Sequence, residues 1–217
     1  MSKIYKLILL FIFIIIPLYL NCSIFAPDPD IIVHCEVDYV SGCVPILKYT
    51  GALISSTTKN EEANSNRRGL DAQASETNLD LPEDITESEL RSFCEDHDEL
   101  SEDISWWVYI IGIKKIYNSN LYAGTTLMDG GSTPGDPSDN DFSATCVKAI
   151  EYLCDPVNTA DLGIASNTAH EIFHQFHVDH CPYNQSCIMF SDLGQVKNDP
   201  PCDICSDHAD DFKVGKP

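Results

Sequence analysis

The residues best suited to chemistry lie close together near the carboxyl end of the chain. Four of the seven histidines fall within the stretch TAHEIFHQFHVDHC, in which His170 to His174 reads H-E-x-x-H. On a helix, residues four apart lie on one face, so both imidazoles can reach the same metal ion. Glu171 can then face the open coordination position of that ion and take a proton from water. The motif predicts a zinc site for hydrolysis, with Glu171 as the general base.

The third metal ligand must come from elsewhere in the chain, because catalytic zinc sites use three protein ligands. No glutamate follows Glu171, which argues against a glutamate ligand further along the sequence. His180 has a suitable spacing after His174 if the helix ends near residue 177 and the chain turns back. His177 is then the turn residue. Two other roles for His177 remain possible: it could be the third ligand in place of His180, or it could lie behind the ligands and contact them. The last alternative is that the site binds no metal.

A methionine follows the histidines, in Cys187-Ile188-Met189. The whole pattern resembles that of the metzincin metallopeptidases, in which H-E-x-x-H-x-x-G-x-x-H precedes a turn that contains methionine. Met189 is similar to that Met-turn methionine, which forms an apolar floor under the zinc. His177 stands where the family has glycine; histidine is among the better non-glycine residues for left-handed backbone, although the conformation is still strained.

The cysteines extend the resemblance to one branch of that group, the archaemetzincins. Those proteins carry a cysteine directly after the third histidine, a Cys-x-Met at the turn and a later Cys-x-x-Cys. This chain has Cys181, Cys187 and the pair Cys202 and Cys205 at corresponding places, with somewhat different spacings. The resemblance is specific from His170 to Cys205 and only architectural upstream.

The resemblance implies an α/β (α+β) fold: a metzincin-like mixed twisted sheet, two long helices, one of which carries the active site, and a cysteine-rich carboxyl-terminal subdomain. It implies one catalytic Zn²⁺ and a second, structural Zn²⁺. The catalytic ion is expected on His170, His174 and His180. The structural ion is expected on four cysteines, Cys181, Cys187, Cys202 and Cys205. Disulfides among these four remain the alternative, because export favours oxidation.

The activity that the resemblance implies is hydrolysis of peptide bonds, as an endopeptidase or an aminopeptidase. Peptide is expected to bind as an extended strand along the sheet edge above the helix. The alternative is a non-catalytic zinc-binding surface lipoprotein, an adhesin or a metal buffer on the same frame. Strain at His177 favours that alternative, whereas the carboxylate of Glu171 beside the ligands speaks against it.

The first 21 residues have the character of a signal peptide. Lys3 and Lys6 precede an apolar run at 7–20, which is too short to span a bilayer comfortably. The run ends in Leu20-Asn21-Cys22, which resembles a bacterial lipobox with asparagine where a small residue is usual. We expect an exported envelope protein, periplasmic or at the cell surface, tethered to a membrane by lipid on Cys22 and residues 22–30. A transmembrane anchor is the alternative.

The net charge limits the possible binding partners, and the number of cysteines limits the possible disulfides. The formal net charge of −21 disfavours nucleic acid and anionic lipid, so we expect no nucleic-acid partner. The resemblance implies a peptide or protein substrate, and we expect a monomer. With Cys22 lipidated, nine of the ten cysteines remain, and an odd number cannot all pair. Cys35 with Cys43 and Cys146 with Cys154 are candidate disulfides. Cys94 then has no partner in this scheme, and we expect it to be a buried or free thiol. The alternative is that Cys94 binds the catalytic zinc and keeps the enzyme inactive.

Residues 31–217 are expected to form one catalytic domain that positions these groups. Thr86 and Glu89 form a capping-box pattern that predicts a helix at 87–100. Apolar periodicity predicts a second helix at 158–176, which carries the histidines and packs Phe173 and Phe176 against the sheet. Strands are predicted at 31–50, 106–117, 121–131 and 144–154, with a polar loop insertion at about 55–80. His34, His97 and His208 are expected in surface or loop positions.

Overall fold

The computed structural model describes residues 31–56, 68–97, 107–128, 141–155 and 158–209. The chain divides into a segment Met1–Asp30 and a compact unit Ile31–Pro217. The predicted signal peptide and the lipid site at Cys22 therefore lie outside the described residues. Within the described ranges, no helix is long and apolar enough to cross a membrane.

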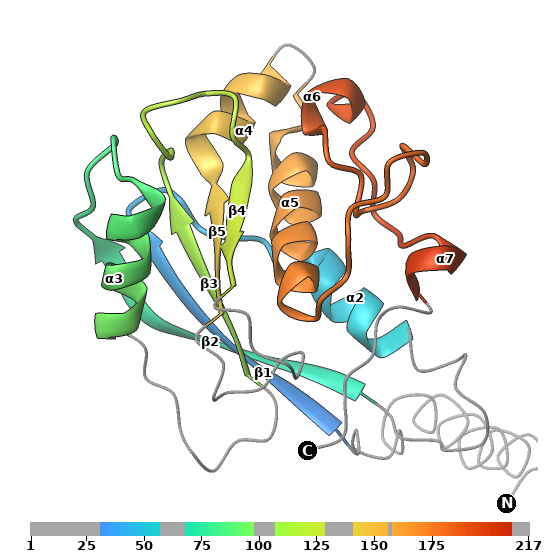
Figure 1. The fold of residues 1–217 in the computed structure, drawn as a ribbon, viewed down its shortest axis with the longest axis horizontal. Helices are drawn as coiled ribbons and strands as arrows, with labels where there is room; N and C mark the ends of the chain where they lie inside the picture. The colour runs from blue at the N-terminus through green and yellow to red at the C-terminus, as the bar shows by residue number, and fades with distance from the viewer. Residues whose placement is uncertain (1–30, 57–67, 98–106, 129–140, 156–157, 210–217) are drawn as a thin grey trace, which may run out of the picture. The chain divides into compact units, whose positions relative to one another are not determined.

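A five-stranded mixed sheet forms the centre of the compact unit (Figure 1). Its strand order is β2-β1-β3-β5-β4, and all neighbours run parallel except β4 and β5, which are antiparallel. The strands are β1 (Ile31–Val40), β2 (Arg68–Leu79), β3 (Trp107–Ile113), β4 (Gly124–Leu127) and β5 (Phe142–Cys146). The near-continuous apolar run of β3 fits its central position, because a strand covered on both faces has no polar side. The predicted mixed sheet is confirmed.

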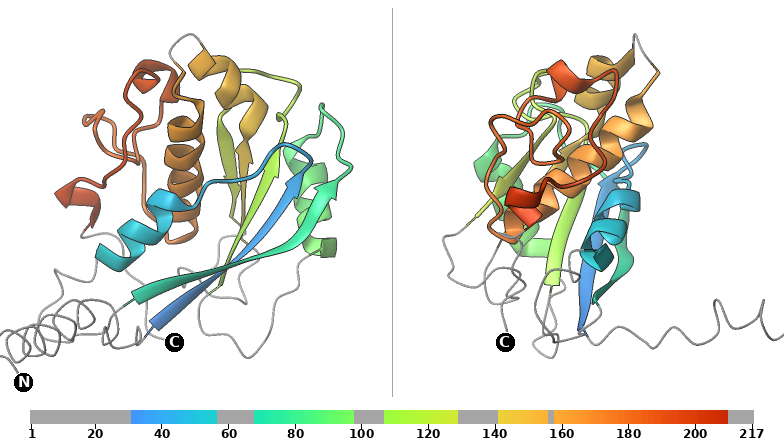
Figure 2. Two further views of the ribbon diagram at one scale, coloured as in Figure 1. Left: turned by 180° about the vertical axis from the view of Figure 1, so that it is seen from behind. Right: turned by 90° about the vertical axis from the view of Figure 1, so that its right-hand side faces the viewer.

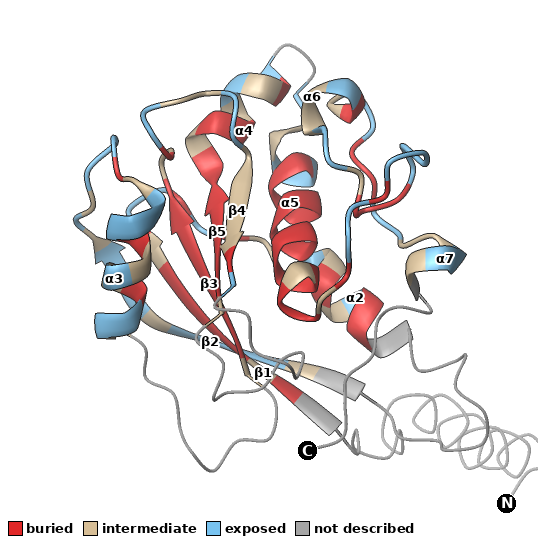
Figure 3. Ribbon diagram, viewed as in Figure 1, coloured by how far each residue is buried: buried red, intermediate tan, exposed pale blue. Residues whose placement is uncertain are grey.

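Helices cover both faces of the sheet (Figures 1 and 2). One core cluster joins β1 and β3 to α2 and α5, and includes Phe173 and Phe176 as predicted. The other places Leu90 and Cys94 of α3 against Tyr109 of β3. Most of α5 is buried (Figure 3). The helices are α2 (Lys48–Ser56), α3 (Glu87–His97), α4 (Val147–Cys154), α5 (Ala160–Gln175), α6 (Leu193–Val196) and α7 (Ser206–Ala209).

The capping box at the start of α3 forms as predicted. The Thr86 main-chain N–H donates to Glu89 Oε2 at 2.9 Å, and the Glu89 N–H donates to Thr86 Oγ1 at 3.3 Å. Both groups satisfy main-chain donors that the first helical turn leaves without partners. The end predicted at residue 100 falls beyond the described residues, which stop at His97 here.

Three element predictions are wrong in part. The polar segment at 55–80 is strand β2 from residue 68 onward, and it stays polar because an edge strand exposes most of its side chains. The strand predicted at 31–50 stops at Val40, and helix α2 begins at Lys48. The strand predicted at 144–154 continues only to Cys146, where α4 begins and buries one helical face.

The two candidate disulfides do not form. Cys35 and Cys43 belong to different core clusters, on opposite faces of the sheet. Cys146 caps the start of α4 and Cys154 ends it. A rise of about 1.5 Å per residue separates their Cα atoms by about 12 Å, well beyond the roughly 7 Å that a disulfide allows. All four are buried free thiols.

Candidate metal centre

The end of α5 produces the turn that the third histidine requires. The Val178 N–H donates to Phe173 O at 3.2 Å, and the His177 N–H donates to His174 O at 2.8 Å. These two bonds form the Schellman motif, which usually has glycine at the residue in left-handed conformation. His177 occupies that position with φ 57°. The structure therefore uses His177 as the turn residue, and the chain beyond it returns toward the helix.

Three imidazoles meet at the carboxyl-terminal half of α5. The Nε2 atom of His174 lies 3.1 Å from Nε2 of His170 and 3.1 Å from Nε2 of His180. These three side chains form a group whose ligand atoms all lie within 4.8 Å of one another, and His177 is outside it. The structure thus brings together the three residues that the spacing predicts as metal ligands.

The main chain fixes the orientation of the first two rings. His170 Nδ1–H donates to Ile188 O at 2.8 Å, and His174 Nδ1–H donates to Val178 O at 2.8 Å. With the proton on Nδ1, each Nε2 presents a lone pair. Burial, and then the neighbouring imidazoles, lower the pKa of His170 to about 3; burial first, then His180, lowers that of His174 to about 4. Both rings are therefore neutral at physiological pH.

Neutral nitrogen lone pairs that face one another need a cation between them, and this donor set fits zinc. A tetrahedral site with Zn–N bonds of about 2.0 Å has ligand nitrogens about 3.3 Å apart, close to the 3.1 Å separations found here. Three histidines also leave one coordination position for a reactant, as in catalytic rather than structural zinc sites.

Glu171 lies in a cleft beside the imidazoles. The cleft has a volume of about 380 Å³, and the residues that line it include Tyr122, Gly124, Ile188 and Phe190. Glu171 is 5% exposed, and burial raises the pKa of its carboxyl to about 8, although the Thr126 hydroxyl opposes this shift. The carboxyl group can therefore gain or lose a proton near neutral pH.

The segment Cys187 to Met189 packs under this site. Met189 is fully buried in the core cluster that contains Phe173 of α5. The Ile188 N–H donates to Asp203 O at 2.7 Å, while the Ile188 carbonyl accepts the bond from His170. The role of Met189 as the Met-turn residue that forms a floor under zinc remains a prediction.

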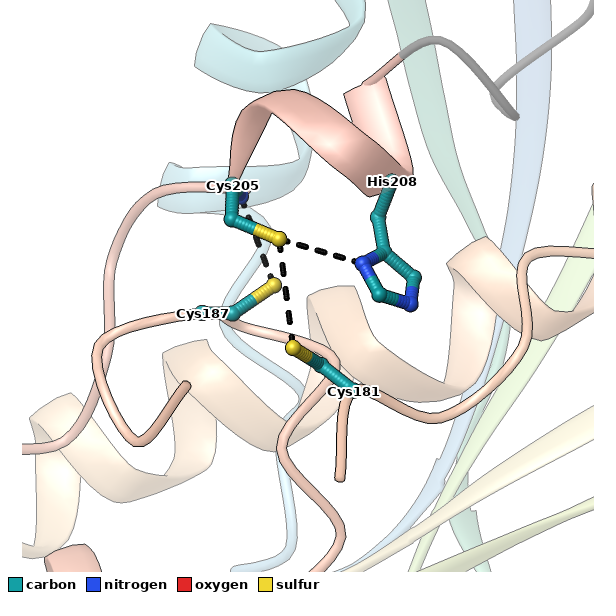
Figure 4. A group of neighbouring side chains, drawn as sticks. All are labelled: Cys181, Cys187, Cys205 and His208. Atoms are coloured by element: carbon teal, nitrogen blue, oxygen red, sulfur yellow. Dashed lines mark hydrogen bonds between the residues drawn. The ribbon is translucent and has the colours of Figure 1, made fainter. Parts of the chain in front are cut away.

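Figure 4 shows a second group of possible ligands, one of which, Cys181, directly follows His180 in the sequence. Cys181 Sγ lies 3.9 Å from Cys205 Sγ, and Cys205 Sγ lies 3.1 Å from Nδ1 of His208. The fourth member is Cys187, whose sulfur accepts a bond from the Cys205 N–H at 3.3 Å. A sulfur separation of 3.9 Å is far longer than the roughly 2.05 Å of a disulfide, so these residues are separate thiols.

The fourth ligand of this group differs from the sequence prediction. Cys202 is exposed and lies outside the group, whereas His208 of α7 is part of it. Helix α7 begins at Ser206, and the resulting turn brings residues three apart to the same side. The spacing Cys205-x-x-His208 was the available signal. His208 is partly exposed, as predicted, but it also belongs to the ligand group, which the sequence prediction did not include. His34 and His97 are partly exposed, as predicted.

Burial also affects the pKa values of the thiols in the second group. Burial opposes ionisation of Cys181, but main-chain N–H groups of Asn184 and Tyr183 lower its pKa below the ordinary thiol value. Burial raises the pKa of Cys187 to about 12. A buried thiol of this kind becomes a thiolate when a metal cation coordinates it. Three sulfurs and one imidazole fit the Cys₃His set of structural zinc sites.

No known protein-family profile matches this chain. No curated protein matches it either. Among solved structures, it is similar to the crystal structure of an archaemetzincin from Methanopyrus kandleri, with a TM-score of 0.47 and 15% sequence identity. The match covers 86% of this chain and 96% of that one.

Proposed function

We propose that this chain is a zinc-dependent peptidase. The observation that carries the proposal is the convergence of three Nε2 atoms, from His170, His174 and His180, beside the buried carboxyl group of Glu171. Zinc held there would supply Lewis acidity, which polarises a peptide carbonyl and makes water nucleophilic at neutral pH. The remaining chemistry belongs to side chains of this protein.

Glu171 is the proposed general base and acid. It takes a proton from the attacking water and delivers it to the nitrogen of the departing amine. A carboxyl pKa near 8, raised by burial, suits a group that must both accept and donate a proton near neutral pH.

Strand β4 is the proposed support for the substrate. It is the edge strand of the sheet and borders the cleft through Gly124. An extended peptide can add to such an edge by main-chain hydrogen bonds, which would carry its scissile bond past Glu171. The proposal covers both endopeptidase and aminopeptidase action, and the lengths of the products distinguish them.

We also propose a second, structural zinc on Cys181, Cys187, Cys205 and His208. Four protein ligands close a zinc site to substrate, so this ion would stabilise the fold. Cys187 adjoins Ile188, whose carbonyl orients His170. The second site would therefore hold the segment that fixes a ligand of the first.

The non-catalytic alternative loses its main support. It rested on strain at His177, and His177 does have a positive φ. The three Nε2 atoms nevertheless lie close together, with His174 3.1 Å from each of its neighbours. Nothing in a zinc buffer requires a buried carboxyl group beside the ligands.

The test compares the parent protein with Glu171→Gln on a mixed peptide library, with zinc content measured for each. We expect the parent to cleave and the variant to lose about 100- to 10,000-fold in kcat, with zinc unchanged. Glu95→Gln, an exposed residue of α3, is the matched control and should cleave like the parent. Zinc-loaded parent protein that cleaves no peptide supports the zinc-binding alternative, and an active Glu171→Gln variant contradicts the assigned base.

A further inference from the structure

Two hydroxyl groups of the sheet contact Glu171, and neither residue lines the cleft. Thr126 Oγ1 of β4 lies 2.9 Å from Glu171 Oε2 and 2.8 Å from Glu171 O. Ser143 Oγ of β5 lies 2.9 Å from the same carbonyl and 3.0 Å from Thr126 Oγ1. Thr126 and Ser143 are directly opposite in the antiparallel register of β4 and β5. Both the backbone and the side chain of Glu171 are therefore tied to the sheet.

One assignment of the hydrogens satisfies every donor in this network. Gln175 Nε2 has two hydrogens, and it donates to Tyr109 O at 2.7 Å and to Ser143 Oγ at 2.6 Å. Gln175 Oε1 accepts from the Tyr109 N–H at 3.2 Å, which fixes the orientation of the amide. Ser143, having accepted from Gln175, has one hydrogen to donate and bonds to Glu171 O. The single hydrogen of Thr126 is then available for Glu171 Oε2.

The other carboxylate oxygen is placed by the same strand. A Cβ atom at Gly124 would lie 2.5 Å from Glu171 Oε1 and 2.5 Å from Asn167 Nδ2. Only a residue without a side chain allows β4 to approach α5 this closely. Asn167 Nδ2 donates to Ala123 O at 3.0 Å and holds that approach. Strand β4 thus contacts Oε1 through Gly124, which borders the cleft, and Oε2 through Thr126.

We propose that Thr126 is a positioning residue that fixes the carboxylate of Glu171 in one orientation, with Oε2 bonded and Oε1 toward the cleft. The inference rests on the proposed function, because it takes Glu171 as the general base. A carboxylate that turns freely about its last side-chain bonds spends part of its time misaligned, and small misalignments of a reacting group are costly in rate. The Thr126 side chain prevents this through its hydroxyl, which is bonded to Glu171 Oε2.

The chain contains a matched control for this residue. Thr125 is its neighbour in β4, but successive side chains of a strand point to opposite faces. The Thr125 hydroxyl accordingly lies toward Glu87 of α3, at 3.4 Å, and away from Glu171. Replacing either threonine by valine removes one hydroxyl and keeps the branched shape and the strand propensity.

The kinetic test compares Thr126→Val, Thr126→Ser and Thr125→Val at equal zinc content. We expect Thr126→Val to lower kcat about 10- to 100-fold, with KM within about twofold of the parent value. Thr126→Ser keeps the hydroxyl and should recover most of kcat. Thr125→Val leaves the main chain of β4 and the hydroxyl of Thr126 in place and should keep the parental kcat, so that any effect on the proposed substrate edge appears in KM alone. A Thr126→Val variant with parental kcat overturns the proposal, as does a loss of kcat that serine does not recover.

A second readout does not depend on activity. Crystal structures of the metal-free parent, Thr126→Val and Thr126→Ser proteins show the Glu171 side chain directly. We expect one orientation in the parent and the serine variant, and a turned or disordered carboxylate in the valine variant. An unchanged orientation in Thr126→Val contradicts the inference. If the parent cleaves no peptide, the proposed function fails, and the orientation of Glu171 still decides the role of Thr126.

Discussion

His177 and His180 are three residues apart, and the structure gives them different tasks. His177 closes the Schellman motif with φ 57°, whereas Nε2 of His180 lies 3.1 Å from that of His174. We therefore predict that His180→Ala loses one zinc per chain and all measurable turnover. His177→Gly should keep both zinc and turnover, and unfold within about 1 kcal/mol of the parent, because glycine adopts this conformation without strain.

Zinc analysis and urea unfolding of the two variants, side by side, check this prediction. Retention of zinc by His180→Ala together with its loss from His177→Gly would reverse the assignment and make His177 the third ligand.

At the residue scale, the first site could be predicted from sequence because its ligands are local. One helix and one turn place all three histidines, so their spacing carries most of the geometry. The second site is different. Cys202 and His208 are both three residues from Cys205, and only the start of α7 at Ser206 decides between them. That boundary of a four-residue helix is not encoded in the spacing of the ligands.

Helix α5 is joined to the sheet by a side chain as well as by apolar packing. Gln175 is 2% exposed, and its amide bonds both the N–H and the C=O of Tyr109. Gln175→Leu would remove the hydrogen bonds of its amide to the N–H and C=O of Tyr109. Each buried main-chain group that loses its partner costs about 1 to 3 kcal/mol. We predict a loss of about 2 to 6 kcal/mol in the free energy of unfolding.

Urea unfolding at fixed zinc concentration measures this loss. Gln185→Leu, which alters an exposed glutamine bonded to Gln195, is the control and should stay within about 0.5 kcal/mol of the parent. Equal stability of the two variants would show that the Gln175 side chain does not stabilise the contact between α5 and the sheet.

At the element scale, burial decided which predictions succeeded. The central strand β3 and the site helix α5 have strong apolar patterns, because tertiary packing covers them. The edge strand β2 has a polar sequence and is defined by main-chain pairing with β1, which leaves no mark on composition. Helix α4 follows β5 without a loop, so its first turn reads as a continuation of the strand.

At the scale of the whole molecule, the sequence of the first 22 residues suggests where the protein is located. We propose that the chain is exported and carries lipid on Cys22, from the lysines, apolar run and cysteine of residues 1–22. Expression in a bacterial host with labelled fatty acid should label the parent protein and leave Cys22→Ser unlabelled. Cys202→Ser, which removes an exposed thiol, should label like the parent. Equal labelling of Cys22→Ser, or a parent without label, would contradict the lipid site.

The zinc content of the full chain, purified without chelator and compared with its count of free thiols, tests the central claim most directly. Two groups of converging ligands, His170 with His174 and His180, and Cys181 with Cys187, Cys205 and His208, predict two zinc ions per chain and no oxidised thiol among these cysteines. One zinc, lost on His180→Ala, would keep the peptidase site and remove the structural one. A protein that holds no zinc, even after zinc is added back, would contradict the account.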